Sequence, residues 1–283
     1  MNPEVLIIGC GFLGEATADL FAAQGIRVLG LVRSSASQAK LFGRTFESAL
    51  CDVTNDSSVA SLTPRVQGIP LAIYCVSSGR GGAEEYAAVY RDGLQRILEC
   101  WQPEKTIFVS STSVYAQNDG SWVTEDSPAE PHRETGKILL EAEQIALRAG
   151  GSVARLSGIY GPGRSVLLKK FLSGEAVLEE GGHRYLNQIH RDDGAAALLT
   201  LADPPITSGI FNVTDDTPAT QREVYSWMSA HLHQPMPPEG SANLNRKRGV
   251  TSKRISNARL RFLGWAPRFP SYRDALAEIF TTV

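Results

Sequence analysis

The first fourteen residues constrain the fold of this chain more than any other stretch. Residues 5–8 (VLII) form a short apolar run, which is typical of a strand buried on both faces. Gly9, Gly11 and Gly14 follow in the spacing G-x-G-x-x-G, and residues 16–24 have the composition of a helix. A strand, a glycine turn and a helix in this order predict a dinucleotide-binding unit.

Each glycine of this turn has a separate expected role. Gly9 allows the tight turn, Gly11 lets the backbone approach a pyrophosphate, and Gly14 lets the helix pack against the strand. The helix start, with Phe12 and Leu13, then offers free N–H groups to the anion. The alternative is a plain tight turn, because a chain with 26 glycines contains chance matches to the spacing.

The overall composition excludes several other classes of protein. A net charge of −2 and a hydrophobic content of 42% give no sign of nucleic-acid binding or disorder. No apolar run approaches the ~20 residues of a membrane helix, and the first run is assigned to a strand, not to a signal peptide. The four cysteines (Cys10, Cys51, Cys75 and Cys100) lack disulfide or zinc spacing, so we expect no metal and a cytoplasmic location.

Strands and helices alternate along the first half of the chain. We expect strands at 27–32, 45–50, 71–76, 106–110 and 152–156, and helical spacing predicts helices at 83–100 and 136–149. This alternation predicts an α/β fold, a Rossmann-type doubly wound parallel sheet, in a domain of residues 1–157.

The pattern changes after residue 157. Glycine and proline become denser, and the predicted elements become shorter: helices at 165–172, 192–201, 220–231 and 271–281, a strand at 209–213 and a loop at 234–245. We expect residues 158–283 to form a smaller, partly interleaved C-terminal region that binds substrate.

The end of the second predicted strand indicates which dinucleotide is bound. An NAD site usually places an acid there, to accept hydrogen bonds from the ribose, whereas residues 26–36 contain no acid and Arg33 follows the strand. An arginine can bind a 2′-phosphate, so we expect NADP, with NAD as the alternative if Arg33 is only a surface charge. The other expected cofactor contacts end the third and fourth strands: Asp52, Val53, Val76, Ser77 and Ser78. Asp52 has a second interpretation, as a turn or helix cap.

Five motifs along the chain resemble one known family. They are GCGFLG at the start, VSSTSVY at 109–115, RLSGIYGPGR at 155–164, IHRDDGAAA at 189–197 and FNVTDD at 211–216. In this order they resemble the extended short-chain dehydrogenases/reductases, which include nucleotide-sugar epimerases and dehydratases. The resemblance runs along nearly the whole chain and implies an NAD(P)-dependent protein.

The resemblance also implies a catalytic Ser or Thr, Tyr and Lys, with a tyrosine four residues before the lysine. Ser111 fits the hydroxyl position, and Lys137 fits the lysine that also holds the nicotinamide ribose. Arg133 stands where the tyrosine is expected, and no tyrosine of the chain has a lysine four residues later. Arginine stays charged at ordinary pH, so it cannot transfer the proton that the tyrosine normally exchanges with substrate.

Three hypotheses follow from this substitution. In the first, the chain is an oxidoreductase or epimerase in which another group supplies the proton: Tyr115 first, then Tyr160 or His132. Tyr115 also has a second interpretation, as packing beside the nicotinamide. In the second hypothesis, the chain is a catalytically impaired NADP(H)-binding sensor or regulatory protein. In the third, its role is only structural.

The sequence gives less information about partners. We expect a small-molecule substrate, with a nucleotide sugar as the candidate that the resemblance implies, and neither nucleic acid nor membrane. The candidate substrate contacts are Arg133, Tyr160, Arg164 and Arg254, the last within a basic stretch at 246–261 that is otherwise a solvated charge run. A homodimer through the helices at 83–100 and 136–149 is a further expectation from the family.

Overall fold

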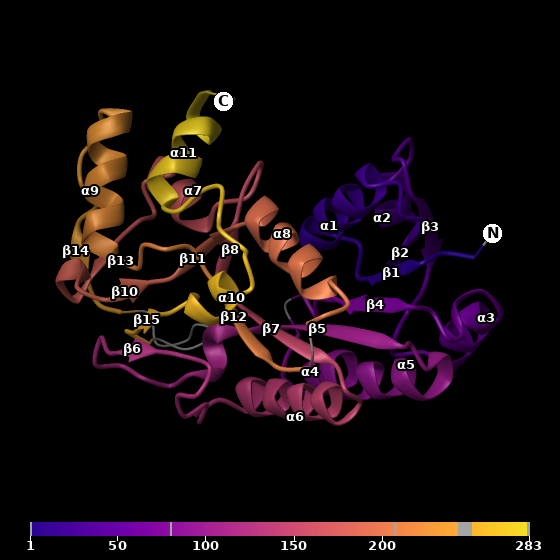
Figure 1. Cartoon of the computed structure of the whole chain (residues 1–283). Helices are drawn as coiled ribbons and strands as arrows, with labels where there is room; N and C mark the ends of the chain where they lie inside the picture. The colour runs from indigo at the N-terminus through magenta and orange to yellow at the C-terminus, as the bar shows by residue number, and fades with distance from the viewer. Residues whose placement is uncertain (1, 80, 207, 243–250, 282–283) are drawn as a thin grey trace.

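A seven-stranded parallel sheet forms the centre of the chain (Figure 1). The computed structural model describes residues 2–79, 81–206, 208–242 and 251–281. In spatial order the strands are β12 (Ile210–Val213), β7 (Ser152–Leu156), β5 (Lys105–Ser111), β4 (Leu71–Tyr74), β1 (Val5–Ile8), β2 (Val28–Val32) and β3 (Glu47–Leu50). The strand order reverses between β1 and β4, and every neighbouring pair is parallel. The predicted Rossmann-type doubly wound sheet is confirmed.

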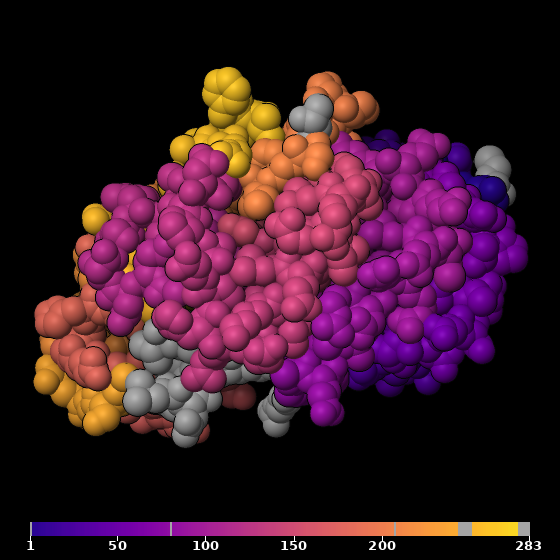
Figure 2. Space-filling view, turned by 90° about the horizontal axis from the view of Figure 1, so that it is seen from below, coloured from indigo at the N-terminus to yellow at the C-terminus, as the bar shows by residue number. Residues whose placement is uncertain are grey.

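Helices cover both faces of this sheet. One face carries α1 (Phe12–Ala23) and α8 (Arg191–Ala202), with α2 (Ser35–Ala39) beside β3. The other face carries α3 (Asp56–Val66), α4 (Ala83–Tyr86), η1 (Ala87–Asp92), α5 (Gly93–Trp101) and α6 (Glu134–Arg148). Figure 2 views the molecule from the side of α5 and α6, and the purple to pink segments that include them form much of the visible surface.

The opening apolar run is buried because its alternate side chains enter two different cores. Leu6 and Ile8 pack with the core under α3, α5 and α6, whereas Val5 and Ile7 pack with the core under α1 and α8. All four side chains are at most 4% exposed. A strand with helices on both sides needs apolar residues at consecutive positions, which explains the absence of alternation in this run.

A smaller region packs beside the carboxyl end of the sheet, with its own apolar core. Its elements are β8 (Gly158–Tyr160), α7 (Val166–Leu172), β9 (Leu178–Glu179), η3 (Glu180–Gly182), β10 (Tyr185–Leu186), β11 (Gln188–His190), β13 (Ala219–Thr220), α9 (Gln221–Leu232), β14 (Glu239–Gly240), β15 (Arg254–Ile255), α10 (Ala258–Phe262) and α11 (Tyr272–Thr281). Two further elements, η2 (Thr112–Val114) and β6 (Trp122–Val123), come from the first half of the chain, and β6 pairs with β15. Conversely, β12 and α8 return to the main sheet, so the two regions exchange segments.

Several boundaries differ from the sequence prediction. The first helix begins at Phe12, not at residue 16, because Gly11 already serves as its N-terminal cap. The predicted loop at 234–245 contains β14, which pairs with β9, and residues 243–250 lie outside the described residues. In the part of the chain that is described, no helix is both long and apolar enough to cross a membrane.

Candidate functional site

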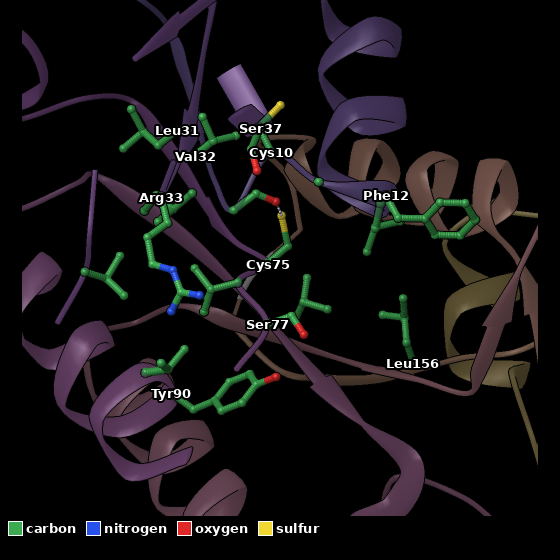
Figure 3. Close-up of a pocket in the computed structure, with 18 of the residues that line it drawn as sticks. Cys10, Phe12, Leu31, Val32, Arg33, Ser37, Cys75, Ser77, Tyr90 and Leu156 are labelled. Atoms are coloured by element: carbon green, nitrogen blue, oxygen red, sulfur yellow. Dashed lines mark hydrogen bonds between the residues drawn. The ribbon is translucent and has the colours of Figure 1, made fainter. Parts of the chain in front are cut away.

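A cavity of about 420 Å³ lies where the strand order reverses, at the carboxyl edge of the sheet (Figure 3). Its wall is made by the turn after β1, by the ends of β2 to β5, by η1, and by the segment that joins β7 to β8. Doubly wound sheets bind their ligands at this position, because the loops on either side of the reversal diverge and leave a crevice.

The glycine turn shapes the floor of this cavity. Gly9 has φ +91°, and a Cβ there would lie 2.6 Å from the backbone N and Cα of Val76. At Gly14 a Cβ would lie 2.4 Å from the carbonyl oxygen of Gly9, which explains the close packing of α1 on β1. At Gly11 a Cβ would meet no atom within 4 Å. The turn is therefore tight at the first and third glycines and open beside the second, as a bound diphosphate requires.

The start of α1 completes a site that fits a diphosphate. Gly11 caps the helix without a side-chain hydrogen bond, and Phe12 and Leu13 line the cavity directly after it. The first N–H groups of a helix have no acceptor within the helix, and the helix dipole adds partial positive charge there. Backbone donors, an open glycine and the dipole together can hold an anionic dinucleotide backbone.

Hydroxyl groups and one arginine form the end of the cavity beside β2. Arg33 lines it from the exposed end of the strand, followed by Ser34 and Ser37. Ser34 caps α2 by accepting a hydrogen bond from the Ser37 N–H at 3.3 Å, and its hydroxyl donates to Ser37 Oγ at 3.0 Å. Asp52, at the end of the neighbouring strand β3, is the only acid among the described residues of the lining, and Arg33 supplies a positive charge that suits a phosphate.

Asp52 and Val53 line the cavity at the end of β3. The Oδ1 atom of Asp52 accepts hydrogen bonds from Thr54, from its N–H at 2.9 Å and from its hydroxyl at 2.7 Å. Burial opposes ionisation, but these bonds and the charge of Arg33 lower the pKa of Asp52 below its usual value. Asp52 therefore caps a turn, as its second interpretation proposed, and also lines the site.

Ser111 lines the opposite end of the cavity, where β5 ends. The residue is 7% exposed, and its hydroxyl accepts a hydrogen bond from the Ser113 N–H at 3.2 Å, which makes Ser111 the cap of η2. Val76 and Ser77 line the wall between Ser111 and the glycine turn, whereas Ser78 is buried and lies outside the lining.

Tyr115 and Lys137 are not among the residues that line the cavity. The Tyr115 side chain is buried; its hydroxyl donates to Asn212 Oδ1 at 2.9 Å, and the Arg155 guanidinium lies 4.8 Å from its ring centre. Burial raises the pKa of Tyr115, although Arg155 and Asn212 oppose this effect. Lys137 is exposed, with its Nζ 3.5 Å from Glu134 Oε2. The catalytic roles expected for both residues remain predictions, and the geometry does not favour Tyr115.

The four expected substrate contacts occupy different places. Arg164 lines the cavity, with its guanidinium 4.9 Å from the centre of the Phe12 ring. Arg133 is exposed at the N-terminal cap of α6, outside the lining. Tyr160 is 2% exposed within the core of the smaller region, and burial raises its pKa.

Arg254 also lies outside the cavity lining. Its guanidinium stacks on the rings of Trp122 and Tyr185, and its Nε donates to the Gly120 carbonyl oxygen at 2.8 Å. It therefore joins β15 to the β6 segment. Arg246, Lys247 and Arg248 of the same basic stretch lie outside the described residues.

Sequence reasoning missed several residues of the cavity. They are Ser34, Ser37, Tyr86, Val89, Tyr90, Ser110, Leu139, Leu156, Ser157 and Ile159. Tyr86 and Tyr90 carried a signal, because two tyrosines four residues apart share one face of a helix. The sequence could not show which structure that face meets.

Three cysteines line the cavity: Cys10, Cys51 and Cys75. Burial raises the pKa of the Cys10 thiol to about 12, that of Cys51 to about 11 and that of Cys75 further still. Cys100 is exposed on α5. Because the thiolate is the reactive form, a thiol-reactive disulfide reagent at pH 8 is expected to label one thiol per chain rapidly and the other three slowly. The Cys100→Ser variant should lose the rapid phase, and a rapid phase that survives would contradict this assignment.

Comparison with known proteins identifies the family. The sequence profile of the NAD dependent epimerase/dehydratase family matches residues 5–214. This chain belongs to that family. The family name agrees with the resemblance found in the sequence, and the matched residues contain the glycine turn, Arg33 and Ser111.

Several solved structures have the same fold. A Methylobacillus flagellatus protein described as an NAD-dependent epimerase/dehydratase is 30% identical, with a TM-score of 0.82 over 100% of this chain and 99% of its own. UDP-glucose 4-epimerase from Thermotoga maritima, solved with UDP-glucose, has a TM-score of 0.85 over 100% and 99% of the two chains but only 18% identity, so it shows the fold alone.

One curated protein gives a reaction type. A 3-diazoavenalumate denitrifying reductase from Streptomyces sp. is 29% identical over 173 residues, which cover 54% of this chain and 55% of that protein. The chain thus matches about half the length of this relative. In the described part of the chain, no group of three or more His, Cys, Asp or Glu residues is arranged to hold a metal ion.

Proposed function

We propose that this chain is an NADP(H)-dependent oxidoreductase that transfers hydride between the nicotinamide and a hydroxyl or carbonyl of a small substrate. One observation carries the proposal: a single cavity extends from Arg33 past the glycine turn to Ser111. The bound cofactor would supply the hydride. Reduction is also the reaction that the name of the Streptomyces relative gives for that protein, which supports this class of chemistry over epimerisation or dehydration.

Ser111 is the residue that this proposal places at the reacting oxygen. Its hydroxyl already accepts one hydrogen bond from Ser113, so its proton is available for donation to a substrate oxygen. The guanidinium of Arg133 carries hydrogen-bond donors and no acceptor, so it cannot take up the proton. Arg164 lines the same cavity and supplies a fixed positive charge for a carboxylate or phosphate of the substrate. A nucleotide sugar would meet this requirement, as would a simpler acid.

The preference for NADP over NAD rests on Arg33, Ser34 and Ser37. Arg33→Ala is expected to weaken NADPH binding by about ten- to a hundredfold, which corresponds to the free energy of one hydrogen bond to a charged group. NADH binding should stay unchanged. The measurement is a fluorescence titration of both variants with NADPH and NADH. Arg65→Ala, on the exposed face of α3, is the matched control and should bind both as the wild type does. Wild-type protein that prefers NADH would contradict the NADP assignment and leave the reaction proposal intact.

A second candidate function, an NADP(H)-binding sensor, is favoured by one observation. The Tyr115 hydroxyl, the first candidate to replace the missing tyrosine, is buried and bonded to Asn212. A carbonyl substrate screen with NADPH separates the candidates, because a sensor would bind NADPH tightly and oxidise it with none of the substrates. Turnover that falls in Ser111→Ala would instead support the oxidoreductase.

Two further expectations belong to this proposal. A homodimer would use α5 and α6, which lie side by side. Just before α5, Arg91 of η1 forms an ion pair with Glu141 of α6 at 3.0 Å. Light scattering after size-exclusion chromatography tests it directly. A cytoplasmic location is supported by the four free cysteines, which suit a reducing compartment.

A further inference from the structure

The cavity contains an unassigned hydroxyl that the family resemblance does not explain. Lys137 matches the lysine that holds the nicotinamide ribose in the family, but here it is exposed, paired with Glu134 and outside the cavity lining. Tyr90 lines the cavity instead, from the helical layer formed by η1.

The local helix geometry presents Tyr90 to the cavity. Residues Ala87–Asp92 form a π-helical turn between α4 and α5, an arrangement that occurs mainly at functional sites. The ring of Tyr90 packs against that of Tyr86, with centres 4.8 Å apart, which limits its rotation. The residue is only 8% exposed, yet its hydroxyl has no hydrogen-bond partner among the described residues. A hydroxyl without a protein partner, in the wall of a ligand cavity, is available to a ligand.

The position of Ser77 indicates which part of the ligand the Tyr90 hydroxyl would contact. Figure 3 shows the Tyr90 hydroxyl directed toward the side of the cavity where Ser77 lies. Ser77 follows β4, which lies between β1, with the diphosphate turn, and β5, with Ser111. Arg33 and Asp52 end β2 and β3, on the other side of β1. Tyr90 and Ser77 therefore lie past the diphosphate turn, toward the nicotinamide end of the cavity.

We propose that the Tyr90 hydroxyl, together with that of Ser77, binds the ribose on the nicotinamide half of the dinucleotide. A ribose presents neighbouring hydroxyls that both donate and accept, and the two protein hydroxyls can do the same without adding charge. Ser77 Oγ accepts a hydrogen bond from the Gly79 N–H at 3.3 Å, which orients its own proton outward. This inference rests on the proposed function, because it requires the cavity to bind a nicotinamide dinucleotide.

The test compares the binding of NADPH with the binding of a ligand that contains only its adenosine half. Tyr90→Phe removes the hydroxyl and keeps the ring, so the thermal unfolding midpoint should not change. The dissociation constant for NADPH is expected to rise about three- to tenfold, the value of one hydrogen bond. The dissociation constant for adenosine 2′,5′-bisphosphate, which lacks the nicotinamide ribose, should stay at the wild-type value. Calorimetric titration measures both. Tyr185→Phe, a tyrosine outside the cavity lining, is the matched control and should change neither.

The other outcomes are equally decisive. If Tyr90→Phe bound NADPH and the bisphosphate more weakly by the same factor, Tyr90 would contact the adenosine half, and the inference would be overturned. Unchanged dissociation constants for both ligands would also overturn it. A selective loss of NADPH affinity in Lys137→Ala but not in Tyr90→Phe would return the role to the lysine. Wild-type protein that binds neither NADPH nor NADH would contradict the proposed function itself, a result distinct from the failure of Tyr90 alone.

Discussion

Replacing Gly9 by alanine is expected to abolish dinucleotide binding and to lower the stability of the fold. The residue has φ +91°, and the new Cβ would lie 2.6 Å from the backbone of Val76, which cannot rotate away as a side chain can. Either the turn or the end of β4 must move, and both line the cavity. We expect the NADPH dissociation constant to rise by more than about a hundredfold, equivalent to about 2.7 kcal/mol. Fluorescence titration and thermal unfolding measure the two effects.

Variants at two other glycines separate the effect on NADPH binding from the effect on stability. Gly43 has φ +81° but nothing within 4 Å of a Cβ, so Gly43→Ala should cost about 1–2 kcal/mol of stability and leave NADPH binding unchanged. Gly11 has ordinary φ and open space beside it, so Gly11→Ala should weaken binding and leave stability unchanged. If Gly9→Ala bound NADPH as the wild type does, the glycine turn would not be the diphosphate site.

Breaking the buried ion pair between Arg155 and Glu143 is expected to cause the largest loss of stability. Both side chains are at most 4% exposed, and Arg155 donates to the two carboxylate oxygens through Nε at 3.0 Å and Nη2 at 2.5 Å. Arg155→Met leaves a buried carboxylate without its cation, so the free energy of unfolding should fall by about 3–5 kcal/mol in urea.

The double variant shows whether the pair or the packing matters. Arg155→Met with Glu143→Leu removes both charges, and it should recover much of the stability that the single change loses. Arg65→Ala breaks an exposed pair with Glu47 and should cost at most about 1 kcal/mol. If the single and double variants were equally unstable, packing around Arg155 would explain the loss. The pair also bears on the site, because Ser110, which lines the cavity, donates to Glu143 at 2.5 Å.

The fold of the first half was predictable because its signals are local. Residues 5–8 are a continuous apolar run, and the strands observed at 5–8 and 152–156 have the predicted bounds. The helix at 83–100 was also found, but not its π-helical turn, because one extra residue per turn leaves no distinct mark in the spacing of apolar residues. The short strands of the smaller region were missed, since pairs such as β6 with β15 join residues more than 130 positions apart.

The residues of the candidate site also differ in how far the sequence could predict their positions. Residues at or just past the end of a strand, such as Arg33, Val76 and Ser111, line the cavity, because parallel strands bring their carboxyl ends to one edge. Tyr115 also follows β5 in sequence, yet η2 intervenes and its side chain enters the core beside Asn212. A few residues past a strand end, the direction of a side chain depends on the packing around it.

The sequence by itself determined the family, the doubly wound sheet and the glycine turn, because each depends on residue types at fixed short spacings. It also determined that residue 133 is an arginine and that no tyrosine stands in the expected position. The tertiary structure decided which hydroxyls the cavity contains. Ser77, Tyr90 and Ser111 meet there and Tyr115 does not, because these residues come from separate elements whose relative positions are set by the packing of helices on a twisted sheet.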